Sequence, residues 1–264
     1  MILSRRVSLG GKQLDEIDNA IVIRGVDTGV AHESVNSVNR MGGFGQRMTT
    51  QHWETLEVAV TFAIDIPKGE LKRRREVFDD VMAWAKAKGW LKTTAQPEKR
   101  MRVDKVILPG AGDMRDWTRD YTITFRAYGV PFWQESSPAT LEVNSITNGT
   151  KSFEVGGIER TVADVTAKNI SGQTIADFTI TVGSNTMTFK GLNLLGTETL
   201  HIYHGTDGLL RIRAETSSGH RNVFSLRTPE SADDLYVDPG TVSVKVESKR
   251  AVKLTVEAAG RWAS

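Results

Sequence analysis

The chain contains the segment Trp53-Glu54-Thr55-Leu56-Glu57-Val58-Ala59-Val60-Thr61-Phe62-Ala63-Ile64. Large apolar side chains stand at every second position from Leu56 to Ile64, and small or polar side chains stand between them. A period of two is typical of a β-strand that buries one face, because successive side chains point to opposite sides of a sheet. The segment therefore predicts a long strand over residues 53–64 and a fold that is built on sheets.

A second alternating segment, residues 121–128, predicts another long strand. Its apolar and polar side chains take turns, with one set formed by Tyr121, Ile123, Phe125 and Ala127 and the other by Thr122, Thr124, Arg126 and Tyr128. Shorter runs of this kind at residues 20–24 and 103–108 predict two further strands. The first half of the chain is therefore predicted to be mainly β.

Residues 71–89, between the two long strands, follow a different period. Apolar side chains recur there at helical spacing, and they are Val77, Phe78, Val81, Met82, Trp84 and Ala85. This spacing forms one apolar stripe along an α-helix, and Gly89 is a suitable C-terminal stop. The sequence predicts a single amphipathic helix over residues 71–89 and no other long helix.

The character of the sequence changes after Ser136-Ser137-Pro138 to short segments rich in Thr, Val and Ile. Two pairs of segments predict hairpins, residues 178–182 with 187–189 and residues 200–203 with 209–213. Valine-rich residues 242–246 and 254–256 predict a closing pair of strands. We expect a β-sandwich here, a boundary near residue 138, and two domains over residues 1–138 and 139–264.

The composition excludes several classes of protein. The 264 residues include no cysteine, so a disulfide framework, a thiol nucleophile and a cysteine-ligated metal are excluded. The 34 Lys and Arg residues nearly balance the 32 Asp and Glu residues, which is too even for a nucleic-acid-binding surface. No signal peptide or membrane-spanning segment is evident, so we expect a soluble product of the cytoplasm.

No motif for catalysis or cofactor binding is present. Neither a G-x-S-x-G nucleophile elbow nor a phosphate-binding G-x-x-x-x-G-K-[ST] loop occurs in the chain. His201 and His204 have the spacing of a metal pair, but on a strand positions i and i+3 point to opposite faces. We interpret them as surface or turn histidines, and we expect no catalytic residue, no cofactor and no metal ion.

Two charged segments have both a simple and a functional interpretation. Lys72-Arg73-Arg74-Arg75 lies in the first turn of the predicted helix, where positive charge meets the positive end of the helix dipole. Asp113, Arg115 and Asp116 belong to a loop of alternating charge. Each segment is either solvated or faces a neighbouring subunit. Changing Arg73, Arg74 and Arg75 to Glu is expected to leave the domain folded, since the apolar stripe is untouched.

The order of elements resembles that of the distal tail proteins of bacteriophages with long, non-contractile tails, the siphoviruses. The resemblance rests on a strand region, the glycine-rich loop Met41-Gly42-Gly43-Phe44-Gly45-Gln46, the long strand, one helix, a closing strand and a small β domain. At the far end, Leu235-Tyr236-Val237-Asp238-Pro239-Gly240-Thr241 and the final Gly260-Arg261-Trp262 are similar to that family's C-terminal domain.

The resemblance implies a structural protein of the virion and not an enzyme. Its implied fold is mainly β, with two β-sandwich domains, of which the first carries a single amphipathic α-helix and the second is galectin-like. Six copies would form a ring that joins the tail tube to the tail-tip or baseplate hub proteins, offers a docking platform, and leaves a channel through which DNA passes without specific binding. No membrane contact is implied, and assembly would take place in the host cytoplasm.

A closed ring needs two different contact surfaces on each subunit. The candidates for these surfaces are Gly42, Gly43, Gly45, Arg73, Arg74, Arg75, Asp113, Arg115 and Asp116. Two alternatives remain open, a carbohydrate-binding two-domain β-sandwich module and a glycan-cleaving enzyme. Against the first, the run from His201 to His204, with Arg211 and Arg213 after it, does not reproduce the order of the sugar-binding residues of galectins. We therefore expect no sugar to bind through His201, Tyr203 or His204.

Overall fold

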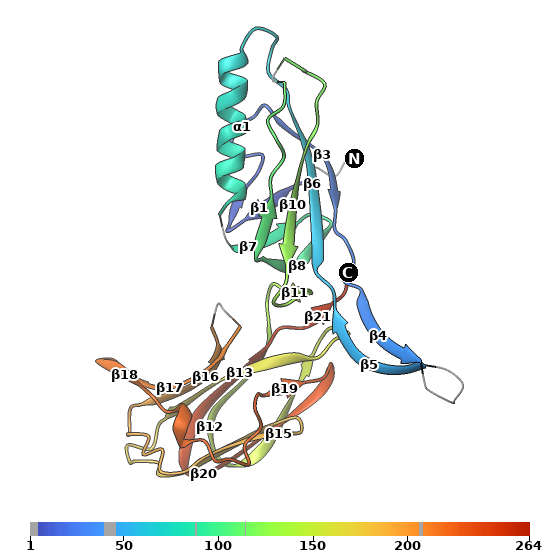
Figure 1. Ribbon diagram of the computed structural model, residues 1–264. Helices are drawn as coiled ribbons and strands as arrows, with labels where there is room; N and C mark the ends of the chain where they lie inside the picture. Colours follow the sequence, from blue (N-terminus) through green and yellow to red (C-terminus); the bar gives the residue numbers. More distant parts are fainter. Residues whose placement is uncertain (1–4, 40–45, 88, 114, 206–207) are drawn as a thin grey trace. The chain divides into compact units, whose positions relative to one another are not determined.

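The computed structural model describes residues 5–39, 46–87, 89–113, 115–205 and 208–264 (Figure 1). The chain forms two compact units, Met1–Gln134 with Ala263–Ser264, and Glu135–Trp262. We call them the N-terminal unit and the C-terminal unit. The fold is mainly β, with antiparallel sheets and, among the described residues, one α-helix. No helix in the described ranges has the length and apolarity needed to cross a membrane.

The predicted long strands lie together in one sheet of the N-terminal unit. Its strand order is β3 (Ile21–Asp27), β6 (Leu56–Ile64), β10 (Tyr121–Ala127) and β9 (Lys105–Ile107). The apolar face predicted for β6 is confirmed, because its alternate side chains from Leu56 to Ile64 are buried. The predicted start at Trp53 is wrong, since that residue ends the preceding strand.

Helix α1 (Leu71–Ala85) packs on this sheet through its apolar stripe. The ring centroids of Phe78 and Tyr121 lie 5.0 Å apart, and those of Trp84 and Phe125 lie 5.9 Å apart. The helix ends before the predicted stop at Gly89, because the buried stripe ends at Ala85 and the next residues are exposed. Gly89 instead begins the strand β7.

A second set of strands completes the N-terminal unit. Its order is β2 (Lys12–Gln13), β1 (Val7–Leu9), β7 (Gly89–Thr93) and β8 (Gln96–Val103). The indole of Trp84 donates a hydrogen bond to the carbonyl of Lys12 at 2.9 Å, which ties the helix to this sheet. The unit's last strand, β11 (Trp133–Glu135), contains the point of division between the two units.

The sequence did not predict the hairpin of β4 (Glu33–Asn39) and β5 (Gln46–Trp53). Within the described part of the chain, these two strands pair with each other and with no third strand. The described residues of the hairpin pair with neither sheet of the unit. A two-stranded ribbon alone is marginally stable in water, so this element gains little stability from its own pairing.

The described part of the C-terminal unit contains one nine-stranded sheet. The main order is β15 (Asn185–Phe189), β14 (Phe178–Val182), β20 (Gly240–Ala258), β13 (Thr161–Asn169), β16 (Thr199–His204), β17 (Leu210–Thr216) and β18 (Gly219–Asn222). In addition, β12 (Ala139–Val155) pairs with β20, and β19 (Tyr236–Val237) pairs with β13. A short 3-10 helix, η1 (Phe224–Leu226), and the strand β21 (Arg261–Trp262) complete the unit.

Both predicted hairpins of this unit are confirmed, as β14 with β15 and β16 with β17. The predicted closing pair is wrong, because residues 242–246 and 254–256 belong to the single strand β20. The polar residues between them suggested a turn. In the structure the hydroxyl of Ser248 accepts a hydrogen bond from the Arg250 N–H at 3.3 Å and donates one to its carbonyl at 2.9 Å, which makes a local irregularity within one strand.

The strand β20 joins the two parts of the sandwich. Its first part, through Ser248, pairs with β14, and its second part, from Val252, pairs with β13. The antiparallel partner β12 accompanies both parts and shifts register between Val143 and Asn148. The strands on both sides contribute to a single buried apolar core, with members such as Ile180 and Ile202.

Candidate functional site

The basic start of α1 is only partly exposed. The side chains of Lys72 and Arg75 are 92% and 72% exposed, and each lies near a carboxylate one turn further along the helix, Glu76 at 3.8 Å and Asp79 at 4.0 Å. Arg73 is half exposed and lies near Asp18 at 3.7 Å and Glu70 at 3.5 Å. Exposed pairs of this kind contribute little to stability. Two of the three predicted arginines, Arg73 and Arg75, therefore lie on the surface.

Arg74 is different, because its side chain is fully buried. It occupies the helical position three and four residues before Val77 and Phe78, so it belongs to the stripe that faces the sheet. Its Nη2 donates to the carbonyl of Asp116 at 2.8 Å, and its guanidinium lies 4.7 Å from the ring of Trp117. The premise that changing the three arginines leaves the buried stripe untouched is therefore wrong, because Arg74 belongs to that stripe.

The mixed-charge loop is structured by its own hydrogen bonds. The side chain of Asp113 accepts the Arg115 N–H at 2.9 Å, and the side chain of Asp116 accepts both the hydroxyl and the N–H of Thr118 at 2.9 and 3.1 Å. These bonds from Thr118 hold the pKa of Asp116 below its ordinary value. The loop thus presents exposed Asp113, Arg115 and Asp116 side chains on a defined turn.

The predicted candidates come together only in part. Arg74 contacts the loop through Asp116, whereas Arg73 and Arg75 pair with other carboxylates. Gly42, Gly43 and Gly45 lie outside the described residues. The role of all nine candidates in subunit contacts stays a prediction.

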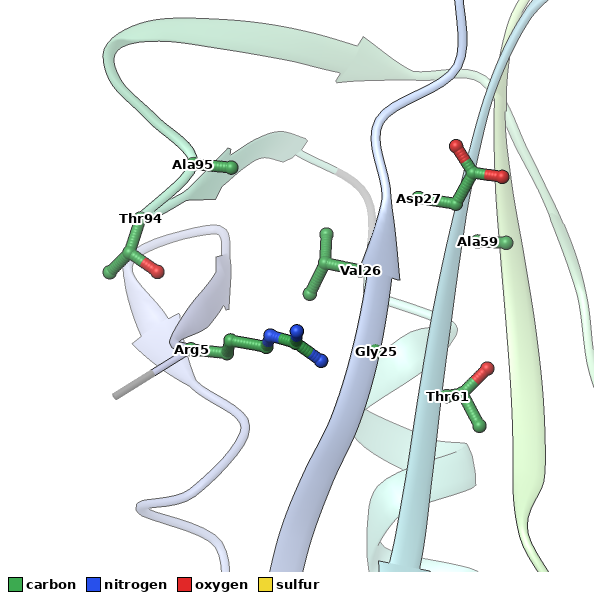
Figure 2. Close-up of a pocket in the computed structure, with 8 residues that line it drawn as sticks. All are labelled: Arg5, Gly25, Val26, Asp27, Ala59, Thr61, Thr94 and Ala95. Atoms are coloured by element: carbon green, nitrogen blue, oxygen red, sulfur yellow. The ribbon is translucent and has the colours of Figure 1, made fainter. Parts of the chain in front are cut away.

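A pocket of about 390 Å³ lies beside β3 in the N-terminal unit (Figure 2). The guanidinium of Arg5 points toward β3 and donates to the carbonyl of Arg24. Across the strand, the hydroxyls of Thr61 and Thr122 lie 2.9 Å apart, and the side chain of Asp27 accepts the Gly29 N–H at 3.1 Å. These polar groups are engaged with the protein's own backbone and with each other. The eight residues that line the pocket include no nucleophile with a neighbouring base.

His204 lies between two carboxylates that the sequence analysis did not predict as its partners. Its Nδ1 lies 2.9 Å from Oδ1 of Asp164, and its Nε2 lies 2.8 Å from Oδ2 of Asp234. The side chain is only 14% exposed, so its interpretation as a surface or turn histidine is wrong. His201 lies apart from it, against Thr166 and Glu215 at 3.3 and 3.8 Å. The two histidines therefore do not converge on a common point.

A second ion pair in the C-terminal unit joins buried Glu198 to Arg221, whose side chain is 41% exposed. Nε and Nη2 of Arg221 donate to the two carboxylate oxygens of Glu198, both at 2.9 Å. The arginine hydrogen bonds lower the pKa of Glu198. Within the described ranges, no group of three or more His, Asp or Glu side chains is arranged to hold a metal ion. The contacts of His204 and of the pair Glu198 and Arg221 connect loops and strands within the C-terminal unit.

Comparison with known proteins shows which solved structures share this fold. No protein-family model and no curated protein matches the sequence. Among solved structures, the Dit protein of phage SPP1, described as a paradigm of the hub adsorption apparatus in phages that infect Gram-positive bacteria, matches over 97% of this chain and 98% of its own, with a TM-score of 0.68 and 12% identity. The chain has the fold of a phage distal tail protein.

Two further matches come from the baseplate of phage p2 in its activated conformation. The structure with Ca covers 98% of this chain and 98% of the matched chain, with a TM-score of 0.54 and 10% identity. The structure with Sr covers 96% and 97%, with a TM-score of 0.51 and 9% identity. The resemblance inferred from element order is thus confirmed at the level of the fold.

Proposed function

We propose that this protein is a structural component of a phage tail tip, and that six copies form a ring between the tail tube and the tip or baseplate hub. The observation that carries the proposal is the fold likeness to the SPP1 hub protein, which extends over nearly the whole of both chains. Such a ring leaves a central channel for DNA. The protein acts by assembly and not by catalysis, as part of a siphovirus virion that is put together in the host cytoplasm.

The unpaired hairpin supports assembly through the N-terminal unit. Among the described strands, β4 and β5 pair only with each other, and a lone ribbon of this kind gains stability when a further surface covers it. A neighbouring subunit in a ring provides that surface. The glycine-rich loop lies between these two strands in the sequence, and we therefore assign Gly42, Gly43 and Gly45 to the proposed contact.

The exposed charges supply groups of both signs for contact with a neighbouring subunit. Lys72, Arg73 and Arg75 provide a basic surface at the start of α1, and Asp113 and Asp116 provide acidic groups on the adjoining loop. We assign these side chains, with Arg115, to the subunit contacts. Arg74 has a different role, because it anchors the loop within one subunit.

We further propose a galectin-like C-terminal domain that docks other tail proteins. The sandwich core and the strand β20 that joins its two parts support this assignment. The boundary near residue 138 belongs to the same proposal. The partners of the protein are then its own copies, the tail tube protein and the hub proteins, with no membrane contact.

Electron microscopy of the purified full-length protein tests the proposal. We expect rings with a central hole, and a mass of six chains by light scattering at high protein concentration. A matched variant, Lys72→Glu with Arg75→Glu, should weaken the ring, while Lys249→Glu with Lys253→Glu in the C-terminal unit should not. A protein that stays monomeric at high concentration and binds a glycan would instead support the carbohydrate-binding alternative.

A further inference from the structure

His204, at the end of β16, is held at both nitrogens of its ring. Nδ1 faces Asp164 on β13 at 2.9 Å, and Nε2 faces Asp234 at 2.8 Å in the segment before β19. The backbone N–H of His204 also donates to Asp164, at 3.1 Å. Three separate parts of the C-terminal unit therefore meet at one imidazole.

This geometry requires the charged form of the ring. A neutral imidazole has one N–H donor, whereas two ionised carboxylates can only accept hydrogen bonds. Both contacts are satisfied together only when both ring nitrogens carry a proton. Burial by itself would lower the pKa of His204, but the hydrogen bonds that the ring donates to Asp164 and Asp234 outweigh burial and raise it to about 9.

The segment that Asp234 belongs to is bound along β13. The side chain of Asp234 accepts the N–H of Leu235 at 2.7 Å, and the carbonyl of Leu235 accepts the N–H of Ala163 at 2.9 Å. The next two residues form β19, which pairs with Thr161 and Val162. Leu235 is fully buried, so this segment covers part of the core.

Other charged groups lie near Asp234 and the segment that it belongs to. Arg261, on β21, interacts with Asp234 and donates to the carbonyl of Arg160 at 3.1 Å, and burial lowers its pKa. Arg160 pairs with Asp238 at 2.9 Å at the exposed edge. His204 is the member of this group whose ordinary pKa is nearest to neutrality.

We propose that Asp164, His204 and Asp234 form a protonation-dependent latch, which holds the segment of residues 234–237 on β13 and releases it when His204 loses its proton. The latch does not depend on the proposed ring, because all of its parts lie within the C-terminal unit. It makes the cover over this part of the core sensitive to alkaline pH. The rest of the sandwich is held by strand pairing, which does not titrate.

The sign of the pH effect follows from the raised pKa. In the open state His204 titrates near its ordinary value of 6.5, and in the closed state near 9. The latch is therefore fully effective below pH 6.5, weakens as the pH rises, and is lost above about 9. Between these values one proton is released on opening, so the opening equilibrium rises about tenfold per pH unit.

Two measurements on the full-length protein test the latch. The first is NMR of His204, which should show both ring nitrogens protonated at pH 7 and a titration midpoint far above that of His201, whose pKa burial lowers. The second is hydrogen exchange of residues 234–237 from pH 6 to pH 10, corrected for the intrinsic exchange rate. We expect the tenfold rise per pH unit in the wild type between pH 6.5 and about 9.

Three variants make the test specific. His204→Gln should abolish the pH dependence and leave the segment more open at pH 7, and Asp164→Asn should lower the titration midpoint of His204. His201→Gln is the matched control on the same strand, and it should keep the wild-type behaviour. A single protonated ring nitrogen at pH 7, a midpoint at or below 6.5, or unchanged pH dependence in His204→Gln would overturn the proposal. The NMR result on the wild type decides the matter even if a variant does not fold.

Discussion

Each unit of the protein buries a cation, but the two cations are held by different kinds of partner. In the N-terminal unit, Arg74 contacts a backbone carbonyl and the ring of Trp117, with no carboxylate in a salt bridge to it among the described residues. In the C-terminal unit, His204 lies between two carboxylates. An arginine keeps its charge at every relevant pH, whereas a histidine does not. The first cation is thus a permanent anchor and the second one can be released.

Charge reversal of the permanent anchor should have the largest effect. Arg74→Glu places a carboxylate in a fully buried position against a carbonyl oxygen, so we expect it to lower the free energy of unfolding by about 3–5 kcal/mol. Arg74→Met keeps an apolar stem in the same place and should cost clearly less. Urea unfolding of both variants is the measurement, with exposed Arg75→Glu as the control. Equal stability of Arg74→Glu and the control would contradict the anchor.

Removal of the titratable cation comes next. At pH 7, His204→Leu leaves Asp164 and Asp234 without their shared partner, and we expect a loss of about 2–3 kcal/mol. The difference from the wild type should shrink as the pH rises through about 9, because the wild type then loses the same charge. Chemical unfolding at pH 7 and pH 10 measures this. A constant difference at both values would show that packing and not charge is responsible.

The pair of Glu198 and Arg221 is an intermediate case between Arg74 and His204. Its cation is an arginine, like Arg74, but its partner is a carboxylate, like the partners of His204. Glu198→Gln should cost about 1–2 kcal/mol near neutral pH, since it replaces a charge-assisted bidentate contact. The folded-state pKa of Glu198 is lowered, so its contribution is present above the ordinary value of 4.5 and is lost as the pH falls through the lowered one. Thermal unfolding should show a difference in stability between the wild type and Glu198→Gln at neutral pH, and this difference should become smaller at acid pH.

The smallest effect on folding is expected for Arg75→Glu. Its side chain is largely exposed, and its carboxylate neighbour Asp79 lies at 4.0 Å. We expect no measurable change in the unfolding midpoint of the isolated chain, because exposed pairs contribute little. Analytical ultracentrifugation at low and high salt should nevertheless show weaker assembly if the proposed contact is correct. A clear loss of stability would place Arg75 with Arg74 as an internal anchor.

The sequence predicted those features that repeat locally. Alternation along residues 56–64 gave the buried face of β6, and helical spacing gave the stripe of α1. The same spacing, extended back by one turn, reaches Arg74, so its burial could have been inferred from its position. The charge of Arg74 favours an exposed site, whereas its position on the helix favours a buried one, and the position prevails.

Other features depend on residues that are distant in sequence. Asp164 and Asp234 lie 40 and 30 residues from His204, so no local pattern indicates that they meet. The continuity of β20 was missed for a related reason. Its polar middle resembles a turn, and only pairing with β12 and with strands on both sides shows that the chain runs on.

The long pairing of β12 with β20 also has a consequence for replacing one part of the protein with another. Ala139 lies opposite Ala258, and the N–H of Glu135 donates to the carbonyl of Gly260 at 3.1 Å, so the chain enters and leaves the C-terminal unit at neighbouring points. Residues 263–264 belong again to the N-terminal unit, where the carbonyl of Ala263 accepts a hydrogen bond from the N–H of Ala31 at 2.8 Å. In the order of the chain, the C-terminal unit is an insertion into the N-terminal unit. An inserted domain of this kind can be shortened, enlarged or exchanged for another domain while the strand connections of the N-terminal unit stay the same.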